Sequence, residues 1–212
     1  HGLTYCQAVE EIMKLEVPPR ALYLRTIWAE LSRIHSHLMW LGFAADAFGF
    51  ESLFMHSWRI REAILDIIEA TAGGRVIFGS CKIGGVRRDI EKSVLSGILD
   101  KLRQIKKDVN GIADVFLSDY SVEHRLRGTG FISRDDAYRL GAVGPMLRAS
   151  GVDLDIRNTG YAAYGDIQFE PVVEHDGDCY ARCAVRVREI YQSFDIIRQA
   201  AGKIPEGAVD MK

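Results

Sequence analysis

The feature that most constrains the fold is a long apolar stripe in residues 20–50, RALYLRTIWAELSRIHSHLMWLGFAADAFGF. Its apolar residues recur at alternating steps of three and four positions. They are Leu24, Ile27, Leu31, Ile34, Leu38, Leu41 and Ala45. This spacing places them on one face of an α-helix, over about six turns. A helix of that length needs other helices to cover its stripe, so the sequence predicts a mainly α fold.

Four further helices are predicted from the same periodicity and from turn residues at their ends. Pro18 and Pro19 end the first, because a residue before proline is displaced from the helical region. Ser52 is the expected N-cap of the second, and Gly73 with Gly74 is its expected stop. Asp178 is the expected N-cap of the last. The four predicted helices cover residues 3–16, 52–72, 89–119 and 178–201.

Residues 121–177 separate the last two long helices and read as an irregular insert. Turn residues interrupt its short apolar runs, and Ser133 with Asp136 three positions on predicts the start of a short helix. The run IQFEPVV predicts an edge strand, since its proline cannot donate a hydrogen bond within a sheet. The expected architecture is a single domain over 1–212, a helical bundle with a helical core at 3–119. A small irregular or β insert precedes the C-terminal helix.

Composition excludes several classes of protein. The chain has 212 residues, is 48% hydrophobic and carries a formal charge of −2, which gives no general support for nucleic-acid binding. Charged residues interrupt every long helix, so no membrane span is predicted. Four cysteines do not amount to a disulfide framework. No Ser-His-Asp, HExxH or paired-carboxylate arrangement appears.

Two pairs of residues resemble metal ligands, and both are better explained by packing. His35 and His37 stand two positions apart on a helix and point about 200° away from each other, so we expect each to hydrogen bond to a neighbour. Cys179 and Cys183 have the i, i+4 spacing that a metal can use, but no CxxC motif accompanies them. All four cysteines are therefore expected to pack as small apolar residues. No metal ligand is assigned within the chain.

The segment RVIFGSCKIGGVRRD at 75–89 is both glycine-rich and basic. Its cations are Arg75, Lys82, Arg87 and Arg88. Such a loop could bind an anion, a phosphate or the carboxylates of a partner. It contains neither GxxxxGK[ST] nor GxGxxG, so nucleotide binding has weak support. The alternative is a buried loop whose arginines pair with acidic helix residues such as Glu62, Asp66 or Glu69.

Several stretches match a known family. They are HGLTYCQAVE, EVPPRALYLRTIWAELSRIHSHLMWLG, FGFESLFMHSWRIRE, GGRVIFGSCKIGGVRRDI, GTGFISRDDAYRLGAVGPMLRASGVDLDIRN and GDCYARCAVRVREI. Together they resemble the catalytic large subunit of membrane-bound, energy-converting NiFe hydrogenases. That subunit is related to the 49-kDa subunit of NADH:quinone oxidoreductase, respiratory complex I. The resemblance covers essentially the whole chain.

The resemblance implies where the metal chemistry lies. In the hydrogenase branch, two CxxC motifs hold a nickel–iron centre, and the first reads approximately RxCGxCxxxH. His1 matches the trailing histidine, so the resemblance implies that both motifs lie outside this chain. The chain then corresponds to a central fragment that binds no cofactor by itself and is inactive alone. His1 would orient a cysteine ligand, and Arg75, Lys82, Arg87 and Arg88 would line the site or face a partner subunit.

Two positions separate the two branches of the family. Subunits of the quinone-reducing branch usually carry an aspartate that aligns with Ala47. They also carry a histidine two residues after the arginine that aligns with Arg75, and Ile77 stands there in this chain. Both differences favour the hydrogenase branch. A 49-kDa-type subunit of an NADH:quinone oxidoreductase is the alternative, and a non-catalytic helical interaction module is another.

The resemblance also implies a setting for the parent protein. It would oxidise H₂ or reduce protons reversibly and pass electrons to iron–sulfur clusters in a small partner subunit. Membrane subunits would hold the assembly on the cytoplasmic side of the membrane. A chain with uncovered apolar faces is also expected to self-associate in isolation, as a dimer.

Overall fold

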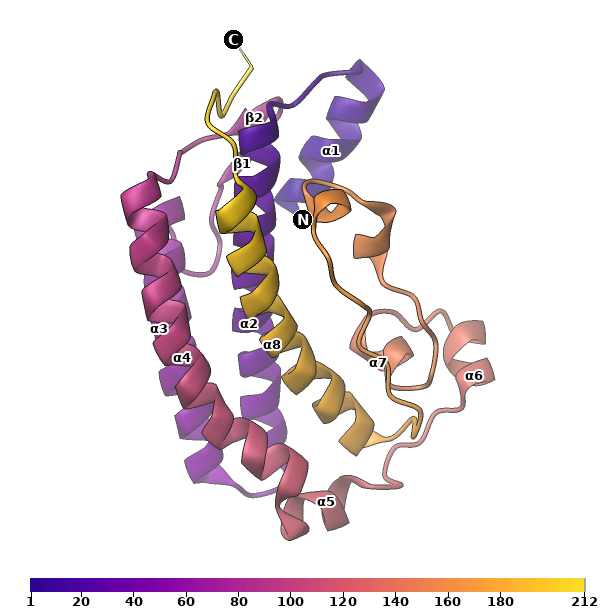
Figure 1. The fold of residues 1–212 in the computed structure, drawn as a ribbon. Coiled ribbons are helices and arrows are strands. Elements are labelled where there is room, and N and C mark those ends of the chain that lie inside the picture. The colour runs from indigo at the N-terminus through magenta and orange to yellow at the C-terminus, as the bar shows by residue number, and fades with distance from the viewer. Residues whose placement is uncertain (212) are drawn as a thin grey trace.

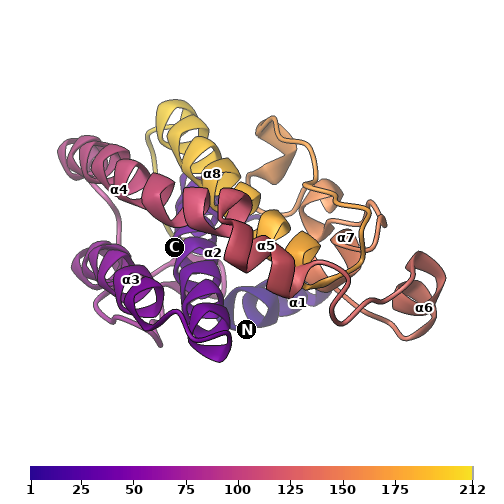
Figure 2. The same ribbon diagram turned by 90° about the horizontal axis from the view of Figure 1, so that it is seen from below.

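Four long helices form a bundle in the computed structural model, which describes residues 1–211. They are α2 (Pro19–Ala47), α3 (Glu51–Ala72), α4 (Lys92–Ser118) and α8 (Cys179–Lys203). Helix α2 packs against α3 and α8, and α4 packs against the same two helices, so the four form a closed ring (Figures 1 and 2). The predicted mainly α bundle is confirmed. No helix in this part of the chain has the length and apolar character needed to cross a membrane.

The predicted apolar stripe lies at the centre of the bundle. All seven of its residues are fully shielded from solvent, from Leu24 at one end to Ala45 at the other. Each buried Leu or Ile contributes roughly 1.5–3 kcal/mol relative to an exposed one. Polar residues of α2 are also buried, among them Arg25, Glu30 and His37. Helix α2 is therefore enclosed on more than one face, which the periodicity of the stripe does not predict.

The helix ends follow the sequence with two exceptions. Helix α1 (Gly2–Met13) ends at Lys14 in a left-handed conformation, four positions before the prolines that were expected to end it. Helix α3 ends at Gly73 as predicted, with a φ of +82°. Asp178 caps α8 as predicted and accepts a hydrogen bond from the Ala181 amide. Ser52 is not an N-cap, because α3 already begins at Glu51 and has no side-chain cap. Its start is instead packed by apolar groups around Phe50.

The strands of the described chain are β1 (Cys81–Lys82) and β2 (Gly85–Val86), which form a small antiparallel hairpin. Glycine is required at two positions, Gly84 in the turn and Gly85 at the start of β2. Gly84 has a φ of +80°, and a Cβ on Gly85 would collide with the Val209 carbonyl oxygen. The C-terminal segment crosses the hairpin there and forms a bridge between Asp210 and Gly85. The hairpin lies inside the glycine-rich basic segment, where no strand was predicted.

The insert is made of short helices and loops on the outer side of α2 and α8 (Figure 1). Ser133 caps α6 as predicted and accepts a hydrogen bond from the Asp136 amide at 3.1 Å. The insert's regular elements are α5 (Tyr120–Leu126), α6 (Arg134–Arg139), α7 (Pro145–Arg148) and the 3₁₀ turns η1 (Ile156–Thr159) and η2 (Tyr164–Asp166).

The predicted edge strand at IQFEPVV is wrong, since residues 167–173 form no strand. Side chains of α8 satisfy the backbone there in place of a neighbouring strand. The Gln168 amide donates to the Gln199 side chain at 3.0 Å, and the Gln192 side chain donates to the Glu170 carbonyl. The insert is therefore irregular and helical, with no β component.

Candidate functional site

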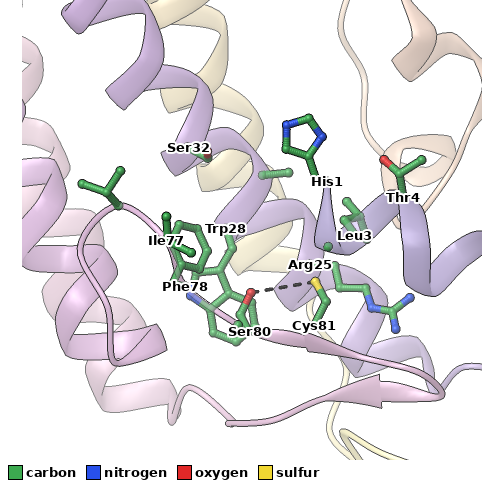
Figure 3. A pocket seen from close by; sticks show the side chains of 14 residues that line it. His1, Leu3, Thr4, Arg25, Trp28, Ser32, Ile77, Phe78, Ser80 and Cys81 are labelled. Carbon is green, nitrogen blue, oxygen red and sulfur yellow. Dashed lines mark hydrogen bonds between the residues drawn. The ribbon is translucent and has the colours of Figure 1, made fainter.

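A pocket of about 480 Å³ opens where α1 begins, between α2 and the loop that leads into β1 (Figure 3). Three segments converge on it. Its lining residues are His1, Gly2, Leu3 and Thr4 from the start of α1, Arg25, Trp28, Ala29 and Ser32 from α2, and residues 76–81 from the loop. The pocket thus joins the first residue of the chain to the glycine-rich segment.

A buried ion pair fixes the wall of this pocket. Arg25 donates two hydrogen bonds to Glu10, at 2.8 and 2.6 Å, and two more to the carbonyls of Lys82 and Gly85. Glu10 also accepts a hydrogen bond from the Gly84 amide at 2.8 Å. Although burial opposes it, the pairing lowers the pKa of Glu10 and raises the pKa of Arg25. One ion pair therefore ties α1, α2 and the hairpin together.

The remaining walls are mainly apolar and contain no activated nucleophile. The indole nitrogen of Trp28 donates to the Thr71 hydroxyl at 3.0 Å, which fixes the ring. Burial raises the pKa of Cys81, the thiol in the wall, and also that of the nearby Cys6. Thiols of raised pKa stay protonated at neutral pH and are poor nucleophiles and metal ligands. The pocket therefore provides a defined shape and hydrogen-bond donors, and the thiols of Cys81 and the nearby Cys6 stay protonated.

Of the five residues predicted for the site, only His1 lines this pocket. It is exposed, immediately before the first residue of α1. Lys82 pairs with Asp210 of the C-terminal segment. Arg87 and Arg88 are exposed, and Arg88 lies against the end of α3, where a Cβ on Gly73 would meet its guanidinium at 2.9 Å. A chemical role for His1 stays a prediction.

Arg75 follows the alternative prediction for the basic segment in its pairing, but the predicted burial is wrong. It pairs with all three acidic residues of α3 that the sequence singled out, Glu62, Asp66 and Glu69. These carboxylates hold the pKa of Arg75 above its ordinary value. Because the whole cluster is exposed to solvent, we assign it a local role at the end of α3 and no role in the pocket.

The two histidines of α2 contact different neighbours, as predicted. His35 accepts a hydrogen bond from Arg61 at 2.6 Å, while His37 is buried and lies 2.7 Å from Glu189. Burial lowers the pKa of both rings. The neutral His37 ring therefore donates its Nε2 proton to the Glu189 carboxylate.

A second feature, which sequence reasoning missed, is a buried ionic network between α2, α8 and the insert. Its first centre is Glu30, which accepts hydrogen bonds from Ser193 at 2.5 Å and from Tyr164, and lies 3.3 Å from Arg33. Arg157 lies 3.5 Å from Glu30 on the insert side. Despite burial, the Arg33 and Arg157 guanidiniums lower the pKa of Glu30.

The second centre of the network is Glu189, which is completely buried. Arg148 of the insert donates to it at 2.9 and 2.5 Å, opposite His37. Against the effect of burial, the His37 hydrogen bond and the Arg148 charge hold the pKa of Glu189 at about 2. Asp155 links the centres, since it pairs with Arg157 at 2.7 Å and lies 3.8 Å from Arg148. The network therefore fastens the insert to the bundle.

A nickel–iron centre does not fit the donors that the chain itself provides. Residues 1–211 contain no group of three or more His, Cys, Asp or Glu side chains placed to hold a metal ion. The cysteines are unpaired, and burial raises the pKa of Cys183 to about 12. Soft metal sites need clustered thiolates. We therefore derive no reaction step through such a centre.

The bundle, the tethered insert and the pocket define a helical scaffold domain, and comparison with known proteins identifies the family to which it belongs. Residues 47–212 match the family described as respiratory-chain NADH dehydrogenase, 49 Kd subunit. The chain belongs to this family.

Named relatives come from more than one kind of complex. The alpha subunit of the membrane-bound hydrogenase of Pyrococcus furiosus is 40% identical over 99% of this chain and 51% of its own length. A subunit of the F(420)H(2) dehydrogenase of Methanosarcina mazei is 39% identical, over 97% of this chain and 55% of its own. A subunit of the NADH-quinone oxidoreductase of Phocaeicola vulgatus is 40% identical, over 95% and 39%. The chain spans about half the length of the first two relatives.

Proposed function

We propose that the chain is the scaffold part of the large subunit of a complex-I-related hydrogenase. The parent would interconvert H₂ and protons and exchange electrons with iron–sulfur clusters in a partner subunit. Membrane subunits would anchor the assembly on the cytoplasmic side. Membership of the 49 Kd subunit family and similarity to a hydrogenase subunit support the general assignment.

The observation that carries the hydrogenase assignment is Ile77. It lines the pocket and is 95% exposed, at the position where the quinone-reducing branch usually has a histidine. An aliphatic side chain cannot donate a proton to a bound quinone or pair with a charged cluster. Ala47, the second distinguishing position, is exposed at the far end of α2, about 33 Å along the helix from Arg25. Neither position offers the polar group of the quinone branch.

Within this proposal the chain's own residues shape and hold the site. The Arg25–Glu10 pair fixes the hairpin next to this wall by bonding to the backbone of Lys82, Gly84 and Gly85. His1 would contact a ligand residue supplied from outside the described pocket. We expect the isolated chain to bind no nickel, because residues 1–211 bring no three potential ligands together and two of the four thiols are buried.

The test is the metal content and activity of the assembled complex. Complex purified through this chain should contain nickel and iron by mass spectrometry and should evolve H₂ from reduced methyl viologen. Quinone reduction by NADH in a nickel-free complex would refute the proposal and assign the chain to the quinone-reducing branch. The isolated chain serves as the control. Stoichiometric nickel in it would refute the proposal that the nickel ligands lie outside this chain.

A further inference from the structure

Two arginines of α8 are buried without a counter-charge. Arg182 and Arg186 stand one helical turn apart and are only 6% and 7% exposed. Within residues 1–211, no carboxylate oxygen lies within 4.0 Å of either guanidinium. They differ in this from Arg148 and Arg157, the neighbouring buried arginines, which both pair with acids.

Arg182 is held by neutral groups. Its guanidinium donates to the carbonyls of Gly130 at 2.6 Å and Gly177 at 2.9 Å, and it lies 3.5 Å from the Cys179 sulfur. Its buried Nε has no hydrogen-bond partner. A buried donor without an acceptor is uncommon in folded proteins and commonly marks a missing water, ion or ligand.

Arg186 makes fewer hydrogen bonds than Arg182. One of its five N–H donors bonds to the Arg182 carbonyl at 3.0 Å. Its guanidinium carbon lies 3.6 Å from the centre of the Trp40 ring, so one face of the group is stacked on the half-buried indole. The stacked ring orients the guanidinium and leaves its edge donors available to an acceptor.

The local charges make this arrangement unfavourable as it stands. Burial, together with the nearby Arg182 and Arg148 charges, lowers the pKa of Arg186 to about 10. Glu189 attracts it from a distance, but that carboxylate is already bonded to Arg148 and His37. A buried cation is stabilised when an anion completes its hydrogen bonds.

We propose that Arg186, stacked on Trp40 and backed by Arg182, is the anchor of a carboxylate-binding site on the α2–α8 face of the bundle. A carboxylate has the planar geometry that accepts two hydrogen bonds from one guanidinium edge. It can be carried by a small organic acid or by an acidic residue of another polypeptide, and the chemistry of recognition is the same.

The first experiment measures the stability of the full chain by urea unfolding in sodium acetate and in sodium chloride of equal ionic strength. A ligand at ten times its Kd raises the folding equilibrium constant about tenfold. We expect acetate to stabilise the wild type, and Arg186→Gln to lose this gain. The control is Arg188→Gln, since Arg188 is on the same helix but exposed and paired with Glu174. General salt effects act on both variants equally.

Chloride alone gives a second, independent outcome. If Arg186 is an uncompensated charge, Arg186→Gln should unfold at the same or a higher urea concentration than the wild type in chloride. If Arg186 only stabilises the fold, the variant should unfold earlier and respond to acetate like the control, and that combination overturns the proposal. Arg186→Lys provides a folded reference should the glutamine variant misfold. It keeps the charge but not the planar edge, so its acetate response should fall.

The second experiment distinguishes the two sources of the carboxylate. A peptide of alternating Gly and Glu is titrated against the full chain beside a Gly and Gln peptide of the same length. Stabilisation by the Glu peptide at concentrations where acetate has no effect assigns the site to a polypeptide partner. Stabilisation by acetate and the Glu peptide at equal carboxylate concentration assigns it to small acids. No response to either ligand overturns the proposal.

Discussion

The contacts of Glu189 allow the stability lost on removing its charge to be predicted as a number. Its carboxylate is completely buried and accepts hydrogen bonds from Arg148 and His37. In Glu189→Gln the side chain keeps its shape, but the Arg148 guanidinium loses its nearest charged partner and retains only Asp155 at 3.8 Å. The interval between a pKa of about 2 and the ordinary glutamate value of 4.5 corresponds to about 3 kcal/mol. We therefore expect the variant to lose about 3 kcal/mol of unfolding free energy at pH 7.

The pH dependence of that loss follows from the direction of the shift. A carboxylate whose pKa is lower in the folded state stabilises the fold above pH 4.5, and this contribution declines as pH falls toward about 2. The difference between wild type and Glu189→Gln should therefore be constant above pH 4.5 and shrink below it. Neighbouring groups such as Asp155 titrate in both proteins and largely cancel from the difference.

The assay is urea unfolding followed by far-ultraviolet circular dichroism between pH 7 and pH 3. Glu174→Gln is the matched control, because Glu174 pairs with Arg188 near the surface and should contribute at most about 1 kcal/mol. The reasoning is refuted if Glu189→Gln costs no more than the control. It is equally refuted if the difference from wild type stays constant down to pH 3.

Three further predictions rest on single contacts. Gly73→Ala should destabilise the chain by about 1 kcal/mol or more, since Gly73 has a φ of +82° and a Cβ would press on the Arg88 guanidinium. Gly97→Ala, in an open position on α4, should stabilise the chain by about 0.5–1 kcal/mol. The urea midpoints of the two variants test this. Leu31→Ala, at a fully buried position, should cost about 2–5 kcal/mol in the same assay, and a cost below 1 kcal/mol would contradict the packing of α2. Cys179 should react with iodoacetamide in the native protein before Cys183, which is buried and has a pKa of about 12; peptide mapping after timed labelling gives the order.

The apolar stripe of α2 shows how much of the fold is predictable. Its seven positions require only a period near 3.6 and are all buried as expected. The hairpin at Cys81–Val86 was not predicted, because it depends on the C-terminal segment crossing at Gly85, more than 120 residues away. The strand predicted at IQFEPVV failed for the same kind of reason. Its backbone partners are side chains of a helix, and no local pattern reveals them.

The pocket and the ionic network show how much of the candidate site can be predicted from the sequence. His1 and the glycine-rich segment were both singled out, and the structure brings them to one pocket. Arg25 and Glu30 were not, since a charged residue inside a helical pattern looks the same whether it faces solvent or a buried partner. The sequence of α2 does offer one indication of buried charge, because charged residues stand on the helix faces that flank the apolar stripe.

The span of the ionic network has a consequence for the order in which the chain folds. Glu30 bonds to Ser193, 163 positions later, and to Tyr164 of the insert. These bonds can form only after the last long helix has docked, whereas the α2–α3 pair needs contacts within one short stretch of chain. Substitutions in the network should therefore accelerate unfolding and leave the folding rate nearly unchanged. The insert therefore docks late in folding. Its contacts with the bundle determine the unfolding rate, and so the lifetime of the native state, more than they determine the folding rate.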